Sequence, residues 1–492
     1  MRHTLLFLCL GLTATGAAHA QTQAAAQTTV SRLDGTTISA SEIDATVTRL
    51  MQAGEVTGVG IAIFNHGNVA YLKAYGFRDT DKKLPVTPDS VMAAASFTKV
   101  AFGYLVMRLV DQGILDLDKP VQDYLPKPLP EYPNYADLAG DPRYKRITAR
   151  MLLSHTAGFP NWRWFEDDHK LKIHFEPGSR YAYSGEGIDL LQLELETITK
   201  TPLEELMLQH VFGPLQMTRT SMVWQSRFDS DFAKGYDEYG RSLGPQKRKT
   251  ADAAGSMQTT LRDFTSFLQA VAVGQGLSQR TFEQMLSPQI QITSKFEFPT
   301  LLPVTTEANK AIRLSYGLGW GLYWTPYGEA FFKEGHDEGW RNYAVYFEQP
   351  KTGIVIMTNS SNGEGIYKDL LETLLKNTFT PIEWEGFTPY NQLPPRPPLK
   401  QHTIVNLPAA VLDLYVGRYG EPNHALTVRR EGDHLTVQEG DGPKQEIFPE
   451  SQSDFFSKVS DDLVTFQFDS VTHAIKMTLH TGGRDILINR LE

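Results

Sequence analysis

The chain has 492 residues, of which 41% are hydrophobic and 21% charged, so its length and composition predict two or three globular domains and exclude a disordered or fibrous protein. The formal net charge is −10 and the sequence contains no basic tract, which argues against nucleic acid or an anionic membrane surface as a partner.

The first twenty residues have the pattern of a secretory signal peptide. Arg2 supplies a positive start, residues 5–12 form an apolar run too short to span a bilayer, and Ala18-His19-Ala20 ends the segment with small side chains. The alternative interpretation is a buried N-terminal helix. We expect cleavage near Ala20 and an exported, soluble protein in the periplasm or outside the cell. Cleavage would remove Cys9, the only cysteine, and with it any disulfide or thiolate site.

Residues 21–40, rich in Gln, Ala and Thr, are expected to form a loose leader after the signal peptide (residues 1–20). Apolar side chains at helical spacing then predict a helix over residues 41–52. Residues 59–64 and 69–75 have strand character and are separated by a short turn, which predicts a hairpin. Residues 96–111 form a helix that is apolar on most faces, which is typical of a helix buried in the centre of a domain.

Residues 115–275 contain mostly helix and loop signals. Strand signals return over residues 316–324, 339–348 and 353–359, and residues 370–375 end this part with a helix. We therefore expect an α/β (α+β) domain over residues 41–385, in which strands from its two ends form one antiparallel sheet flanked by helices and the middle forms an all-α subdomain.

A proline-rich stretch at residues 386–402 predicts a stiff linker. Short alternating runs follow, including residues 426–428, 435–437, 464–468 and 486–488. They predict a small all-β domain, a barrel or a sandwich, over residues 403–492.

Ser96 and Lys99 form the only S-x-x-K pair in the chain. A serine hydroxyl is a weak nucleophile that needs a base beside it, and residues three apart lie on one face of a helix. Lys99 can therefore hydrogen-bond to Ser96, and the N–H of a serine at the helix start is free to bind an oxyanion. A capping serine with a surface lysine is the structural alternative.

Four ordered motifs extend this pair into a family resemblance. The segments are residues 96–99 with 113–120, Leu152-Leu153-Ser154-His155-Thr156-Ala157-Gly158-Phe159-Pro160, residues 177–185, and Tyr316-Gly317-Leu318-Gly319-Trp320. With these segments the chain resembles class C β-lactamases, DD-peptidases and family VIII esterases, and residues 403–492 resemble the lipocalin-like β domains that follow such hydrolases.

The resemblance implies that Tyr183 relays protons, the alternative being a core tyrosine, and that Tyr181 is structural. The family's third motif is assigned to Lys333-Glu334-Gly335, which follows the 316–320 segment. The literal Lys351-Thr352-Gly353 is interpreted as a hairpin turn. The backbone N–H of His336 then becomes the second oxyanion donor.

Two positions depart from the family pattern. Gly185 stands where asparagine is usual, and Glu334 stands where threonine is usual, beside the expected place of a substrate carboxylate. Repulsion between two carboxylates there would cost on the order of a few kcal/mol. The sequence thus favours a serine hydrolase, acting through an acyl-enzyme, on small-molecule or peptide esters or neutral amides. The alternatives are a β-lactamase or DD-peptidase, and a non-catalytic binding protein. No cofactor or metal motif is present, and no oligomeric state is implied.

Overall fold

The computed structural model describes residues 29–396, 400–420, 425–440, 444–458, 460, 462–468, 475–481 and 484–491. The predicted signal peptide, with Cys9 and Ala20, lies outside these residues. Over the described ranges, no helix combines the length and the apolarity that a bilayer crossing requires.

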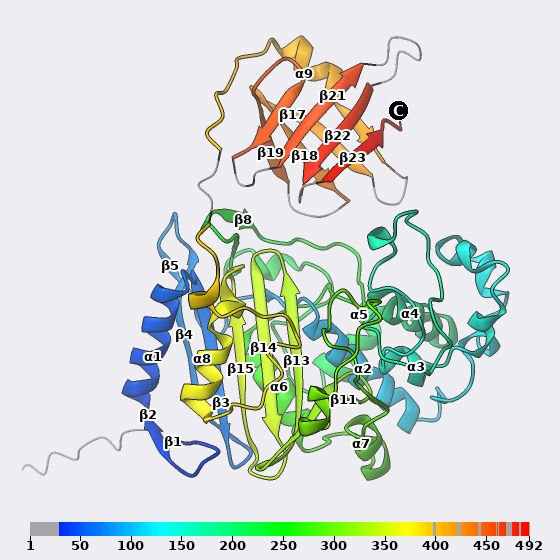
Figure 1. Ribbon diagram of the computed structural model, residues 1–492, viewed down its shortest axis with the longest axis vertical. Coiled ribbons are helices and arrows are strands. Elements are labelled where there is room, and N and C mark those ends of the chain that lie inside the picture. Colours follow the sequence, from blue (N-terminus) through cyan, green and yellow to red (C-terminus); the bar gives the residue numbers. More distant parts are fainter. Residues whose placement is uncertain are drawn as a thin grey trace, which may run out of the picture.

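A nine-stranded antiparallel sheet forms the centre of the larger domain (Figure 1). Its central strands join the two ends of the domain, because β15 pairs with β3 and thereby connects segments nearly 300 residues apart. This confirms the predicted single sheet. In spatial order the strands are β10 (Ile290–Gln291), β11 (Ser315–Tyr316), β12 (Gly321–Thr325), β13 (Gly328–Asp337), β14 (Trp340–Phe347), β15 (Thr352–Thr358), β3 (Gly58–Asn65), β4 (Asn68–Asp79) and β5 (Leu84–Pro85).

Helices cover both faces of this sheet. On β15, Ile354 and Ile356 pack in the same core as α1 (Ala40–Ala53) and α8 (Tyr367–Leu370), which continues as a π-helical turn over Leu371–Leu375. The alternate residues of β15 pack in the core that contains α2 (Phe97–Asp111) and α6 (Leu261–Ala272). Because successive side chains of a strand point to opposite faces of the sheet, alternate residues of β15 contribute to two different cores.

The helix α2 is buried over nearly its whole length, as its apolar sequence predicted. Every residue from Phe97 to Met107 is buried, and the helix packs closely on the segment between β11 and β12. There a Cβ atom on Gly103 would lie 3.7 Å from the Cα atom of Gly319, whose φ of +96° favours glycine.

The middle of the domain is mainly helical. Its helices are α3 (Ala149–Leu153), α4 (Gly185–Thr199), α5 (Leu203–Met207) and, after α6, α7 (Gln279–Met285). Two short strand pairs interrupt this region, β6 (Met92–Ala93) with β9 (Gln258–Thr259), and β7 (Gly235–Tyr236) with β8 (Ser242–Gly244). Tertiary pairing of two- and three-residue segments leaves too short a pattern to be seen in the sequence.

The prediction of a loose leader is wrong for residues 29–39. They form a strand pair, β1 (Thr29–Ser31) with β2 (Thr37–Ser39). Asn65, the last residue of β3, holds β1 in place, since its side chain accepts from the Ser31 N–H at 2.7 Å and donates to the Ser31 carbonyl at 2.8 Å. Val30 is fully buried as a result.

The C-terminal part is an eight-stranded antiparallel sheet, curled into a nearly closed barrel (Figure 1). A bridge between Tyr419 and Arg490 brings its first and last strands together, and α9 (Ala409–Tyr415) adds Leu412 to its core. The strands are β16 (Gly417–Tyr419), β17 (Leu426–Glu431), β18 (His434–Glu439), β19 (Gln445–Pro449), β20 (Asp454–Ser457), β21 (Leu463–Phe468), β22 (Ile475–Thr481) and β23 (Arg484–Asn489).

The stretch before the barrel lies partly against the larger domain. Phe387 is buried, and Arg396 hydrogen-bonds Asn362 at 2.8 Å and forms an ion pair with Glu55 at 2.6 Å. The boundaries of the linker stay a prediction.

The contact between α2 and α6 gives a stability test. Phe97 and Phe264 stack with ring centroids 4.0 Å apart, and neither is exposed. We expect Phe264→Ala to lower the free energy of unfolding by about 3–5 kcal/mol, because it leaves a cavity beside α2. Urea unfolding followed by near-ultraviolet circular dichroism measures this. Phe77→Ala, at a position 43% exposed, is the control, and equal midpoints for the two variants would contradict the packing argument.

Candidate active site

Ser96 lies at the N-terminal end of α2 as its N-cap residue, one position before the helix begins. Its side chain makes no capping hydrogen bond and is partly exposed. The structural alternative, a capping serine with a surface lysine, is therefore not what the chain forms. A helix N-terminus also leaves backbone N–H groups unpaired and carries a partial positive charge, which suits a developing oxyanion.

Lys99 is held against this hydroxyl in a buried position. Its Nζ donates to Ser96 Oγ at 3.1 Å and to the Ala254 carbonyl at 2.6 Å, and the residue is only 2% exposed. Burial, followed by the positive charge of Lys333, lowers the Lys99 pKa to about 8, while nearby carboxylates such as Asp252 oppose this shift. A lysine with such a pKa can exchange a proton near neutral pH.

The turn before Ser96 is strained and tethered. Ala95 has a φ of +49°, a left-handed conformation that costs a non-glycine residue on the order of 1–3 kcal/mol. The Asn342 side chain on β14 donates to the carbonyls of Ala93 and Ala94, each at 3.1 Å. This tether joins the nucleophile turn to the central sheet.

Lys333 and Gly335 face the turn from the free edge of β13. Pairing with β12 ends at Phe332, so residues 333–337 have no strand on that side. A Cβ atom on Gly335 would lie 2.7 Å from the Ala94 carbonyl oxygen, so only glycine permits this approach. The His336 side chain is turned to a different partner, with Nδ1 3.1 Å from Glu364, in keeping with a structural role.

Tyr183 lies between the two lysines. Its ring centroid is 5.1 Å from Lys99 Nζ and 4.7 Å from Lys333 Nζ, and the residue is only 2% exposed. Burial, and then the charge of Glu334, raises the Tyr183 pKa well above its usual range, whereas the Ser96 hydroxyl acts in the opposite direction. The neutral phenol is therefore the resting form.

His155 positions the tyrosine segment. Its Nδ1 accepts from the Ser184 N–H at 3.2 Å, and its ring packs 4.4 Å from that of Tyr183. Burial, and then the charges of Lys99 and Lys333, lowers the His155 pKa well below its usual range, so the imidazole is neutral. Tyr181 points elsewhere and donates to Glu297 at 3.0 Å.

Lys333 is fully buried and forms an ion pair with Glu334. Burial alone would lower the Lys333 pKa, but Glu334, Tyr316 and Glu297 more than offset it, so the pKa is raised and the ammonium is retained. Its positive charge is therefore balanced within the protein.

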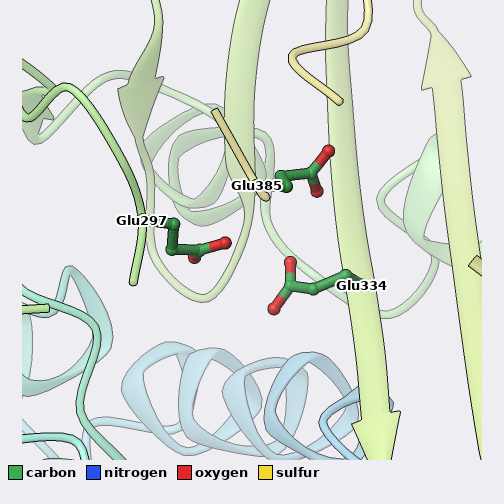
Figure 2. A group of neighbouring side chains, drawn as sticks. All are labelled: Glu297, Glu334 and Glu385. Carbon is green, nitrogen blue, oxygen red and sulfur yellow. The ribbon is translucent and has the colours of Figure 1, made fainter. Parts of the chain in front are cut away.

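Three glutamates meet beside Lys333. Figure 2 shows Glu334, which comes from β13, beside Glu297 and Glu385 from distant segments, and oxygens of the three carboxylates lie within 4.8 Å of one another. Burial, and then the charge of Glu334, raises the pKa of both Glu297 and Glu385 well above the usual range. Carboxylate oxygens can bind a hard cation, but the ammonium of Lys333 already occupies Glu334. The cluster therefore consists of one carboxylate paired with Lys333 and two buried carboxyl groups whose raised pKa values favour their protonated forms.

Lys351 lies in the turn between β14 and β15, with a φ of +49°, and Thr352 begins β15. The turn expected from the sequence is therefore present there. Ala254, Glu297 and Glu385 were not predicted as site residues, because they reach the site from separate loops and carry no local signal. Trp162, whose ring lies 5.8 Å from Lys99 Nζ, was not predicted either. The aromatic run at residues 162–165 was the available signal for it.

Known proteins resemble this chain over both parts. The Beta-lactamase family model matches residues 43–375, and a domain of unknown function, DUF3471, matches residues 402–489. Protein flp of Staphylococcus aureus (strain MW2) is 28% identical over 41% of this chain and 42% of its own length, so the chain matches less than half of that relative. Penicillin-binding protein 4* of Bacillus subtilis (strain 168) is 24% identical over 79% of this chain and 85% of its own length.

Solved structures share the fold at low identity. An octameric penicillin-binding protein homologue from Pyrococcus abyssi has a TM-score of 0.57 and 21% identity, covering 91% of this chain and 99% of its own. The D-alanine carboxypeptidase AmpC from Burkholderia cenocepacia has a TM-score of 0.53 and 21% identity, covering 65% and 95%. With a family model that spans most of its larger domain, this chain belongs to the Beta-lactamase family.

Proposed function

We propose that the protein is a serine hydrolase that cleaves an ester or a neutral amide through an acyl-enzyme. The observation that carries the proposal is the contact of 3.1 Å between Lys99 Nζ and Ser96 Oγ in a buried setting, with the lysine pKa lowered to about 8. Membership of the Beta-lactamase family supports it.

The reaction proceeds in two steps, acylation of Ser96 and hydrolysis of the acyl-enzyme. Ser96 Oγ attacks the substrate carbonyl carbon, and its proton passes to the Lys99 amine, with the Tyr183 hydroxyl as a relay. The N–H groups of Ser96 and His336 donate to the carbonyl oxygen as it becomes negative. The bond to the leaving group then breaks, and the leaving group takes the proton. Water repeats the attack on the acyl-enzyme, releasing the acid and restoring the Ser96 hydroxyl.

In this scheme Lys333 supplies positive electrostatic potential at Tyr183, and the negative charge of Glu334 reduces that potential. The same ion pair places a carboxylate beside the reacting groups, which disfavours a substrate that carries its own carboxylate. The substrate is therefore an ester or a neutral amide. The protein is exported if the predicted signal peptide is cleaved near Ala20.

A second function, β-lactamase or DD-peptidase, draws support from the names of the relatives, which include a penicillin-binding protein and a D-alanine carboxypeptidase. A third, a binding protein that has lost catalysis, is motivated by the altered positions Gly185 and Glu334.

Ser96→Ala tests the nucleophile. We expect the variant to lose at least a thousandfold in kcat/KM for p-nitrophenyl acetate, since no other group would form the acyl-enzyme. The control is Ser266→Ala, an exposed serine on α6. A fluorophosphonate probe should label the wild type on the peptide that contains Ser96. Undiminished turnover by Ser96→Ala would remove this residue from the mechanism, and a wild type that neither turns over nor labels would favour the binding protein.

The pH dependence tests Lys99. If its neutral amine accepts the Ser96 proton, kcat/KM for an uncharged ester should rise with pH and level off above about 8. Asp252→Asn should move this rise to lower pH, because it removes a negative charge that raises the Lys99 pKa. The amide oxygen can still accept the Ala254 N–H, now bound at 2.7 Å.

The control for this measurement is Asp413→Asn, at an exposed carboxylate on α9 in the barrel domain, which should leave the profile unchanged. A shift of the Asp252→Asn profile toward higher pH would contradict the assignment of Lys99 as the base.

Glu334→Thr tests the charge argument. We expect slow or undetectable hydrolysis of nitrocefin by the wild type, and an increase of at least tenfold in the variant, because the carboxylate that repels the substrate is gone. Glu338→Thr, an exposed glutamate in the following turn, is the control. Rapid nitrocefin turnover by the wild type, or its labelling by a fluorescent penicillin, would instead establish the second function.

A further inference from the structure

The ring of Trp162 fills the space beside Gly185, near the Lys99 amine. A Cβ atom built on Gly185 would lie 2.3 Å from the Cη2 atom of Trp162, so no side chain fits at position 185 while the ring stays there. The same ring lies 5.8 Å from Lys99 Nζ. The wall of the site beside the reacting amine is therefore aromatic.

The segment that carries Trp162 is fixed to the start of α4. Asn161 accepts the Gly185 N–H through its backbone and side-chain oxygens, each at 3.0 Å. Arg163, on the other side, forms an ion pair with the buried Glu186 at 2.6 Å. With both of its neighbours anchored, the ring is held in position before any substrate arrives.

Aromatic surface continues outward from Trp162. Trp164 stacks on it with centroids 4.6 Å apart and planes 10° from parallel, and Phe165 follows at 6.2 Å from Trp164. Trp164 is 48% exposed and Phe165 is 64% exposed. Large apolar side chains exposed together beside a reactive group are typical of a binding surface.

A second aromatic segment lies against Tyr183. The ring of Phe298 is 5.6 Å from that of Tyr183 and is 44% exposed. The ring of Phe296 is 41% exposed, but the Lys295 ammonium lies 5.1 Å from its centroid, so Phe296 does not extend the uncharged surface. Between Phe296 and Phe298, Glu297 is buried, its N–H bonded to the Trp384 carbonyl at 2.9 Å. Because Glu297 is fixed in the interior, the neighbouring rings of Phe296 and Phe298 lie at the surface.

The ammonium groups next to Ser96 do not reach this surface. Lys333 is fully buried and paired with Glu334, and Lys99 is 2% exposed and bonded to Ser96 and a carbonyl. Neither lysine can hold an anionic group that lies among the exposed rings.

We propose that Trp162, Trp164, Phe165 and Phe298, the aromatic rim, bind an uncharged hydrophobic acyl group of the substrate, an alkyl chain of several carbons or an aryl group. The inference rests on the proposed function and adds the substrate class to it. Apolar contacts with the rim stabilise a longer acyl chain in the transition state, so they raise kcat/KM for that chain over a short one.

The test compares p-nitrophenyl esters that differ only in the acyl group: acetate, hexanoate and hemisuccinate, the last bearing a carboxylate. We expect the wild type to prefer hexanoate over acetate by at least tenfold in kcat/KM and to disfavour the hemisuccinate. Trp164→Ala and Phe298→Ala should each lower the hexanoate-to-acetate ratio of kcat/KM by about tenfold, because each removes a ring that the longer chain contacts and the acetyl group is too short to use. Both side chains are exposed, so the variants should fold, and their melting temperatures check this.

Trp324→Ala is the matched control, because Trp324 is an exposed tryptophan at the hairpin end of β12. It should leave the ratio unchanged. If Ser96-dependent turnover shows no preference for hexanoate, or if both rim variants keep the wild-type ratio, the rim does not bind the acyl group while the proposed function stands. If Ser96→Ala turns over every ester as well as the wild type does, the proposed function fails and the rim proposal fails with it.

Discussion

The buried contact between Lys99 and Ser96 is the constraint on which the rest of the site depends. An ammonium group removed from water loses its hydration. For Lys99, the lost hydration is partly replaced by hydrogen bonds to one carbonyl and one hydroxyl, and by the negative charge of nearby carboxylates. The outcome is a lysine whose charged and neutral forms are close in free energy near neutral pH. An exposed lysine at the same helical spacing would stay charged and could not accept a proton from serine.

The surrounding fold maintains this balance through charges that are buried in pairs. The charge of Lys333 adds to the cost of a charged Lys99, and Glu334 is paired with Lys333 and partly offsets it. Glu297 and Glu385 lie beside this pair, and their pKa values are raised well above the usual range. The site therefore contains two lysines and three glutamates without a large net charge.

Backbone geometry brings these groups together. The left-handed Ala95 turn, the Asn342 tether and the absence of a side chain at Gly335 place the start of α2 against the free edge of β13. At Gly185 the opposite occurs, because a glycine admits the ring of Trp162. The two glycines thus have different roles: Gly335 lets two backbone segments approach each other, and Gly185 leaves space for the ring of Trp162.

Much of this was present in the sequence. The periodicity of residues 96–111 predicted a buried helix, the spacing of Ser96 and Lys99 placed them one turn apart, and the context of Lys333 separated it from the turn residue Lys351. These are local properties, fixed by the helical repeat or by the residues of a turn. Local pattern also predicted one antiparallel sheet and a separate β domain, although not the β1–β2 pair, whose order depends on Asn65.

Only the tertiary structure decided which distant residues surround that pair. Ala254, Glu297, Glu385 and Trp162 come from four separate segments, and nothing in their local sequence states that they meet. The depth of burial, which lowers the Lys99 pKa, is likewise a property of everything packed around α2. A sequence can place two residues on one face of a helix, but the electrostatic environment of that face is set by segments that the fold brings to it.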